Sequence, residues 1–146
     1  MDRVVEFASQ NPLLVMAFIT LLLVFIFTEI RRASRGYKDV ETGPATRMIN
    51  DGAVVIDVRQ PDAYRKGHVA GAANYPVDRI EAHADDIAKR VKKAKGQPIL
   101  IYDDMGMGAG KAAAALVKQE LGVEIYNLKG GLTAWQRENL PLKKKG

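Results

Sequence analysis

The sequence predicts an α/β fold with a doubly wound parallel sheet, preceded by one transmembrane helix. Short apolar, β-branched runs alternate with helical segments and short links over the larger, C-terminal part of the chain. This alternation is typical of a parallel sheet with right-handed crossovers. Before it, residues 13–27 read LLVMAFITLLLVFIF, in which Thr20 is the only polar side chain. A surface helix of a soluble domain would carry a polar face, so this run is expected to lie outside the domain.

The apolar run at 13–30 has 18 residues, close to the roughly 20 that a helix needs to cross a bilayer. A cleaved signal peptide and a buried core helix are the alternatives. A signal peptide would have a basic N-terminal region and a small-residue cleavage site. Here Arg3 stands against Asp2 and Glu6, and charged residues rather than Ala-x-Ala follow the run. We therefore predict a transmembrane anchor.

The flanks of this run predict its orientation. Only Arg3 precedes it, whereas Arg31, Arg32, Arg35 and Lys38 follow it. Because Lys and Arg are retained on the cytoplasmic side, residues 1–12 should be extracytoplasmic and the C-terminal domain cytoplasmic. The chain has no cysteine, which is compatible with a reducing compartment.

Residues 31–146 hold 21 Lys and Arg against 14 Asp and Glu, a formal charge of +7. The basic residues gather in RRASR at 31–35, KRVKKAK at 89–95 and KKK at 143–145. No aromatic residues are interleaved with them, which argues against binding of single-stranded nucleic acid. We interpret the flank after the span as attracted to anionic lipid headgroups, at roughly 1 kcal/mol per basic residue near the surface. Ordinary solubilising charge is the alternative.

The chain after the span divides into a linker at 31–37, a domain at 38–142 and a basic tail at 143–146. Within the domain, a helix is expected over 42–50, with Pro44 in its first turn and Thr42 or Gly43 as its cap. The other expected elements are a strand over 53–58, a helix over 61–66, a short strand within 67–77, a helix over 78–94 broken near Ala84, a strand over 98–102, a helix over 110–121, a strand over 123–128 and a short last helix that begins near Gly130 and holds Trp135.

A glycine-rich loop connects the strand ILIY to the helix at 110–121. It consists of Asp103, Asp104, Met105, Gly106, Met107, Gly108 and Ala109. Its glycines allow backbone N–H groups to turn inward, and the helix adds unpaired N–H groups and a positive dipole end. Together they predict an anion-binding loop. It is not a P-loop, because no Ser or Thr follows Lys111. A tight turn without a ligand is the alternative.

Three stretches of the chain resemble a rhodanese domain, in the family's order. They are VVIDVRQPDAYRKGHVAGAANYPV, ILIYDDMGMGAGKAAAAL and IYNLKGGLTAWQRENLPL. The resemblance covers residues 38–142. With the span in front, the chain is similar to single-pass inner-membrane rhodanese-like proteins of proteobacteria. The resemblance implies the inner membrane as the location.

Rhodaneses carry sulfur as a cysteine persulfide, and the position of that cysteine corresponds to Asp103. A polar loop residue of the family corresponds to Ala109. Because the thiolate is the nucleophile in this chemistry, the resemblance implies a catalytically inactive domain without a cofactor. We expect a binding or scaffold module whose ligand is a small anion or a protein, including another membrane protein. A sulfurtransferase that uses a partner's cysteine and a hydrolase that uses Asp103 remain alternatives.

The absence of a thiol suggests what fills the loop. We expect the Asp103 carboxylate to accept the loop N–H groups, with a solvent-facing carboxylate as the alternative. By resemblance, Asp57 and Arg59 stabilise the turn that faces the loop. The family often has an acidic residue where this chain has Ala63, which leaves the partner of Arg59 open. His68 is expected to be a hydrogen-bonded turn residue, and the sequence has no metal-ligand spacing.

Overall fold

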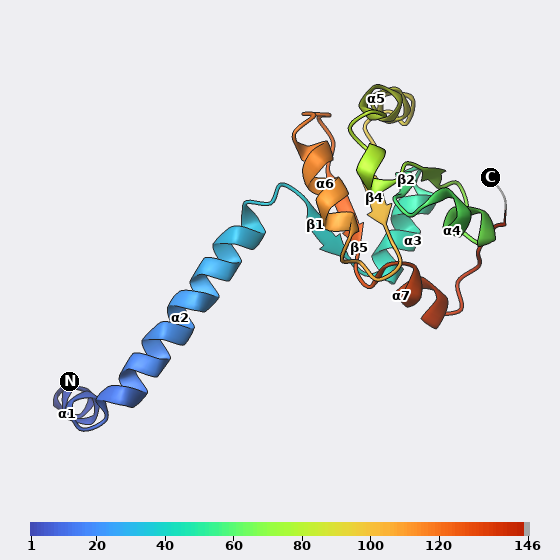
Figure 1. Ribbon diagram of the computed structural model, residues 1–146. Helices are drawn as coiled ribbons and strands as arrows, with labels where there is room; N and C mark the ends of the chain where they lie inside the picture. Colours follow the sequence, from blue (N-terminus) through green and yellow to red (C-terminus); the bar gives the residue numbers. More distant parts are fainter. Residues whose placement is uncertain (145–146) are drawn as a thin grey trace. The chain divides into compact units, whose positions relative to one another are not determined.

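The computed structural model describes residues 1–144, and the chain divides into two units, Met1–Arg35 and Gly36–Gly146. The first unit consists of α1 (Asp2–Gln10) and α2 (Pro12–Ala33), drawn in blue in Figure 1. The side chains of α2 are exposed, and its mean hydropathy reaches 2.7. At 1.5 Å per residue, its 22 residues extend over about 33 Å. The helix is therefore long and apolar enough to cross a membrane.

The helix α2 continues beyond the predicted span. Arg31, Arg32 and Ala33 were expected in the linker, but they form its last turn. Arginine and alanine are good helix formers, and positive charge near a helix C-terminus is favoured by the helix dipole. The linker after the helix is correspondingly shorter than predicted.

The second unit confirms the predicted α/β fold. Five parallel strands form one sheet in the order β1-β5-β4-β2-β3. The strands are β1 (Lys38–Val40), β2 (Val54–Asp57), β3 (Ala73–Asn74), β4 (Ile99–Tyr102) and β5 (Ile125–Leu128). The helices are α3 (Thr42–Asn50), α4 (Pro61–Lys66), the 3-10 helix η1 (Val77–Arg79), α5 (Ala84–Lys93), α6 (Ala109–Val117) and α7 (Gly131–Arg137).

Successive residues of the central strands point to opposite faces of the sheet, so each face builds its own core. On one face, Ile56, Ile99 and Ile101 pack with the apolar sides of α5 and α6. On the other face, Val55, Leu100, Tyr102 and Leu128 pack with Ala45, Leu132 and Trp135. Burial on both faces explains why VVID and ILIY lack the polar alternation of a half-exposed strand. Trp135 is a residue of this second core.

The structure corrects several element boundaries. The strand β1 was not predicted, because its three residues KDV form no apolar run; pairing with β5 makes it a strand. The predicted break near Ala84 is confirmed, because a turn that buries Ile80 separates η1 from α5, which begins at Ala84. The cap of α3 is Glu41, and Thr42 is instead a buried residue of its first turn. The helix α6 ends at Val117 rather than near 121, before Glu120 takes a φ of 51°.

The C-terminal boundary also differs from the prediction. Lys143 was expected in the basic tail, but its backbone pairs with that of His68, with N–O distances of 2.8 and 2.7 Å. The ordered domain therefore includes this residue. The last two residues of the predicted tail, 145–146, lie outside the described residues.

Candidate functional site

The predicted loop lies at the carboxyl end of β4, in the middle of the sheet, and continues into α6 (Figure 1). The neighbouring strands β2 and β5 run parallel to β4, so their carboxyl ends reach the same edge. Ligands of doubly wound sheets bind at this edge. The fold thus brings together the loop, the residues after β2 and the first turn of α7.

The carboxylate of Asp103 lies inside the loop. Its Oδ1 accepts a hydrogen bond from the N–H of Gly106, and its Oδ2 accepts from Gly108 (2.5 Å) and Ala109 (3.0 Å). The expected position of this carboxylate is confirmed, and the solvent-facing alternative is wrong. The N–H groups around the start of α6 would otherwise lack a partner within the helix. A negative charge at this helix end is also favoured by the helix dipole.

Two glycines keep room for this arrangement. Gly106 has a φ of 86°, a conformation that L-residues rarely adopt. A Cβ at Gly108 would lie 2.9 Å from Oδ2 of Asp103. A side chain at either position would therefore displace the loop or the carboxylate. The sequence pattern Gly-x-Gly, read as a means of turning amides inward, serves an internal anion here.

A second set of contacts fixes the loop from α7. The N–H groups of Leu132 and Thr133 donate to the carbonyl oxygens of Asp103 (2.8 Å) and Asp104 (2.9 Å), and the Thr133 hydroxyl also donates to Asp104 (2.8 Å). A Cβ at Gly131 would lie 2.5 Å from the Asp103 carbonyl oxygen, so only glycine permits this approach. The sequence reading did not predict these contacts. The pair Gly130-Gly131 is the signal that indicates them.

The partner of Arg59 is Asp57. The guanidinium Nη2 lies 2.7 Å from Oδ2 and Nε lies 3.0 Å from Oδ1, while the Arg59 N–H also donates to Oδ1 (2.9 Å). Asp57 is fully buried. Burial alone would lower the pKa of Arg59, but the hydrogen bond and charge of Asp57 outweigh it and raise that pKa.

The same guanidinium connects this pair to the loop. Nη2 donates to the carbonyl oxygen of Gly67 (2.6 Å), and Nη1 lies 3.4 Å from Oδ1 of Asp104. Asn74 holds the turn from the other side by donating to the carbonyl oxygens of Asp57 and Arg59. The role expected for Asp57 and Arg59, stabilising the turn beside the loop, fits these contacts.

Tyr102 closes the base of this cluster. Its hydroxyl accepts a hydrogen bond from the N–H of Val69 (3.0 Å), and its ring centroid lies 5.9 Å from the Arg59 guanidinium carbon. Burial raises the pKa of the Tyr102 hydroxyl, and the negative charge of Asp57 raises it further. The hydroxyl is therefore neutral and structural.

His68 lies apart from the Asp103 contacts. Its Nδ1 is 2.9 Å from the carbonyl oxygen of Tyr64, its ring stacks on the Tyr64 ring at 3.8 Å, and its backbone pairs with Lys143. These contacts agree with a hydrogen-bonded turn residue. They give it no contact with a reacting group in the loop.

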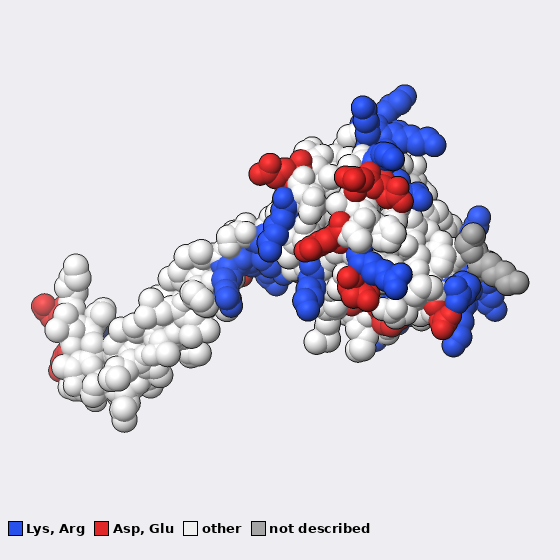
Figure 2. Space-filling view, turned by 45° about the horizontal axis from the view of Figure 1, so that its top comes forward, with Lys and Arg blue, Asp and Glu red and all other residues white. Residues whose placement is uncertain are grey.

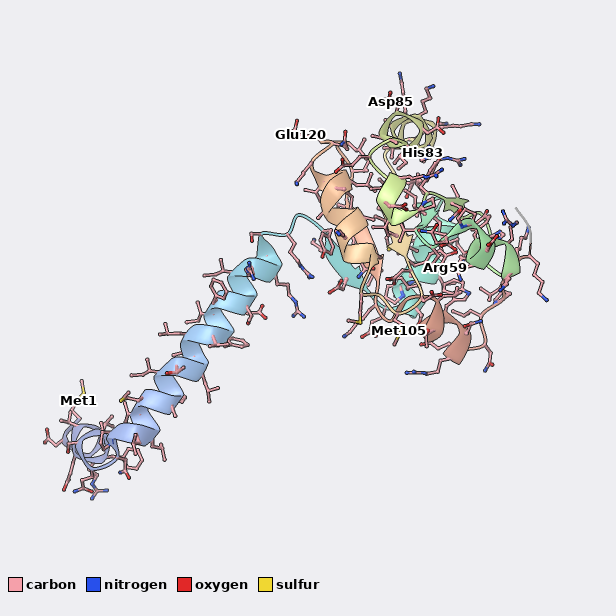
Figure 3. All side chains as sticks on the ribbon, viewed as in Figure 1. Met1, Arg59, His83, Asp85, Met105 and Glu120 are labelled. Carbon is pink, nitrogen blue, oxygen red and sulfur yellow. The ribbon has the colours of Figure 1, made fainter. Side chains whose placement is uncertain are left out.

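The outer rim of the loop is formed by Asp104, Met105 and Met107. Met105 is 65% and Met107 84% exposed, and the Asp104 carboxylate is also largely exposed. Figure 3 shows Met105 and Arg59 on this side of the domain. The rim offers thioethers and one carboxylate but no thiol or hydroxyl. None of these groups can carry a sulfane sulfur.

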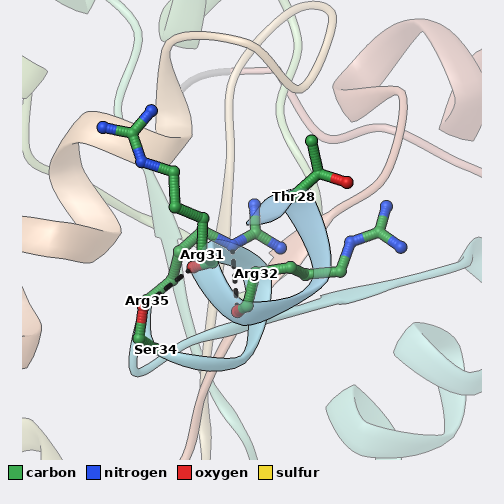
Figure 4. A pocket seen from close by; sticks show the side chains of 5 residues that line it. All are labelled: Thr28, Arg31, Arg32, Ser34 and Arg35. Atoms are coloured by element: carbon green, nitrogen blue, oxygen red, sulfur yellow. Dashed lines mark hydrogen bonds between the residues drawn. The ribbon is translucent and has the colours of Figure 1, made fainter. Parts of the chain in front are cut away.

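The first unit holds a separate basic pocket. Arg31, Arg32 and Arg35 line it with Thr28 and Ser34 (Figure 4). Nε of Arg35 donates to the carbonyl oxygen of Arg32, and the Ser34 hydroxyl donates to that of Arg31. Figure 2 shows blue side chains at this end of α2, whereas the length of the helix is white. Guanidinium groups match the geometry of phosphate oxygens.

Comparisons with known proteins agree with this geometry. The chain is 36% identical over 143 residues to YibN of Escherichia coli K12, with 97% of each chain covered. It is 30% identical over 101 residues to the thiosulfate sulfurtransferase GlpE of Pseudoalteromonas translucida, covering 68% of this chain and 90% of GlpE. BH2092 of Bacillus halodurans has a similar structure, with a TM-score of 0.61, 25% identity and coverage of 86% and 85%.

The family assignment follows from the sequence match as well as from the fold. The model of the rhodanese-like domain family matches residues 43–138, which contain β2, β4, β5 and the loop between β4 and α6. The chain has the rhodanese fold but no cysteine, which is consistent with loss of persulfide catalysis. The protein belongs to the rhodanese-like domain family.

Proposed function

We propose that the protein is a membrane-anchored rhodanese-like domain that does not transfer sulfur and serves as a binding or scaffold module at the cytoplasmic face. One observation carries the proposal: the Asp103 carboxylate accepts the N–H groups of Gly106, Gly108 and Ala109. By resemblance, this is the position of the family's persulfide. A carboxylate fills the anion-binding loop without providing the nucleophile.

The same contacts argue against a hydrolase that uses Asp103. Both carboxylate oxygens accept backbone N–H groups, so they are hydrogen-bonded within the loop rather than presented to a substrate. A general base must instead reach the proton that it removes. The surface left for a partner is the rim of Asp104, Met105 and Met107, together with the outside of the domain.

The membrane part of the proposal rests on the first unit. The predicted span 13–30 lies within α2, whose side chains are exposed and apolar. We place residues 1–12 outside the cytoplasm and the domain at 38–142 inside, because Arg31 and Arg32 occupy the last turn of α2. The basic pocket at this end suits anionic lipid headgroups, and another membrane protein is the proposed class of protein partner.

Three measurements on the full-length protein test this proposal. Purified protein should transfer no sulfur from thiosulfate to cyanide above background, and turnover after rigorous removal of contaminating rhodanese would overturn the inactive assignment. A C-terminal fluorescent-protein fusion should be active in the cytoplasm, whereas activity of a C-terminal alkaline phosphatase fusion would overturn the orientation. Crosslinking in native membranes should then capture a membrane protein, and its absence would argue against the scaffold role.

A further inference from the structure

The short helix α1 has an exposed apolar side. Val4, Val5 and Phe7 are 71%, 68% and 53% exposed. At 100° per residue, they fall on one side of the helix together with Met1 and Ala8. The other side carries the polar residues Asp2, Arg3, Glu6, Ser9 and Gln10. A helix with this division between two sides and this exposure has an apolar face without a partner within its own unit.

The junction to α2 places this face beside the apolar segment. Asn11 alone separates the two helices, with φ −130° and ψ 58°, and Pro12 begins α2. The backbone N–H and the side-chain amide of Asn11 both donate to the carbonyl oxygen of Phe7, each at 3.0 Å. The end of α1 is therefore capped, and α1 turns away from the axis of α2 (Figure 1). Because the two helices are joined directly at Asn11 and Pro12, α1 lies at the interface of any membrane that α2 crosses.

We propose that α1 lies in the plane of the extracytoplasmic membrane interface, with Val4, Val5 and Phe7 among the acyl chains. This inference rests on the proposed span. Amphipathic helices bind the interface through buried apolar area, with their polar side toward the headgroups. The continuity of α1 with an exposed apolar helix identifies a lipid surface as the occupant of the face.

The charges of α1 predict which lipids it needs. Asp2 and Glu6 offset Arg3 and the amino terminus, so α1 offers no net attraction to anionic headgroups. The other end of α2 instead presents the basic pocket of Arg31, Arg32 and Arg35. We therefore expect α1 to insert equally into zwitterionic and anionic leaflets. This distinguishes it from the basic pocket, which should prefer anionic lipid.

The cysteine-free chain allows a direct test. Single substitutions Val4→Cys and Phe7→Cys report the apolar side, and Glu6→Cys and Ser9→Cys are matched controls on the polar side. Leu21→Cys reports the span. Each full-length variant is labelled with an environment-sensitive fluorophore in phosphatidylcholine vesicles, and quenching is measured with shallow lipid-borne and with water-soluble quenchers.

The expected result is several-fold stronger quenching by lipid at positions 4 and 7 than at 6 and 9, unchanged by added anionic lipid. If Leu21 is quenched from water, the span itself fails. If Leu21 is shielded but the four α1 positions respond alike, the span holds and the α1 inference is overturned. Shielding at 4 and 7 without lipid quenching identifies a protein contact, such as a second copy, and overturns the lipid assignment. An intact mass that lacks both α1 and α2 identifies a cleaved leader and overturns both.

Discussion

The Arg59 guanidinium binds both carboxylate oxygens of Asp57, and its Nη1 also lies 3.4 Å from Oδ1 of the exposed Asp104 in the loop. The buried pair therefore joins the end of β2 to the loop after β4. Since Asp57 is fully buried, the pair sits where an unpaired charge is costly.

Asp57→Asn should destabilise the domain by about 3–5 kcal/mol, because it leaves the Arg59 guanidinium buried without its counter-charge. Chemical denaturation followed by circular dichroism measures the loss. Asp62→Asn is the matched control, since Asp62 pairs with Arg65 on the exposed side of α4. It should change stability by less than about 1 kcal/mol. Equal losses of stability in the two variants would contradict the claim that burial of the Asp57–Arg59 pair makes its disruption costly.

Asp103→Ala should destabilise the domain by roughly 1–3 kcal/mol, because the N–H groups of Gly106, Gly108 and Ala109 lose their acceptor. Sulfate or phosphate should restore part of the melting temperature, since the emptied loop can take an external anion. Asp103→Asn should behave similarly, because its amide nitrogen must face at least one loop N–H. A wild-type melting curve for Asp103→Ala, insensitive to these anions, would show that the carboxylate does not stabilise the loop.

Asp103→Cys should allow the domain to form a persulfide. The thiolate would stand at the helix N-terminus that now holds the carboxylate, an environment that lowers the pKa of a cysteine. The thiolate would attack the outer sulfur of thiosulfate and release sulfite. Mass spectrometry after incubation with thiosulfate should then detect the addition of one sulfur atom. Met105→Cys is the matched control, since its exposed side chain lies on the loop rim. A persulfide on both variants, or on neither, would argue that the anion-binding loop does not favour a persulfide at position 103.

Stability at high pH should depend on Tyr102. Its pKa is raised in the folded state above its ordinary value of 10.0, first by burial and then by Asp57. Its contribution is therefore fully present below pH 10 and decreases as pH rises above it, because the unfolded chain ionises first. Tyr102→Phe should weaken this alkaline loss, while costing about 1–3 kcal/mol near neutral pH by leaving the Val69 N–H unpaired. Tyr126→Phe, at a less buried site, should retain most of the alkaline loss of stability. If the free energy of unfolding falls equally with pH above 10 in the two variants, the loss does not come from Tyr102.

Replacement of Arg31, Arg32 and Arg35 by Gln should reduce the preference of the protein for anionic vesicles. At roughly 1 kcal/mol per basic residue, the loss should approach about 3 kcal/mol at low salt. Comparison of phosphatidylcholine vesicles with and without phosphatidylserine measures it. Replacement of Lys89, Lys92 and Lys93 of α5 is a control that removes the same charge elsewhere. An equal effect of both triples would mean that net charge, rather than the pocket, determines binding.

The parts of the fold that could be predicted are those with strong local signals. Burial on both faces favours apolar residues in the strands β2, β4 and β5, and positive φ favours glycine in the loop, so the sequence indicates both. The strand β1 could not be predicted, since KDV becomes a strand only by pairing with β5. The break near Ala84 could be predicted, and the turn there buries Ile80 in the core on one face of the sheet.

In the candidate site too, the local contacts could be predicted from the sequence and the distant ones could not. The Asp103 contacts follow from a local rule, because a carboxylate and free N–H groups lie within six residues of each other. The contacts of Leu132 and Thr133 join parts of the chain that are about thirty residues apart, which no local pattern encodes. For Arg59, the resemblance directed attention to Ala63, whereas the partner was two residues upstream.

The pairing of Lys143 with His68 has a practical consequence for work with fragments. The family match ends at residue 138, but the chain beyond it still packs on the domain. The carbonyl oxygen of Pro141 accepts a hydrogen bond from the Trp135 indole, and Leu142 packs on the core that contains Trp135. The backbone of Lys143 then pairs with that of His68. A recombinant fragment cut at the family boundary would lose these contacts and expose the Trp135 side of the sheet. Expression of the isolated domain should therefore extend through Lys144.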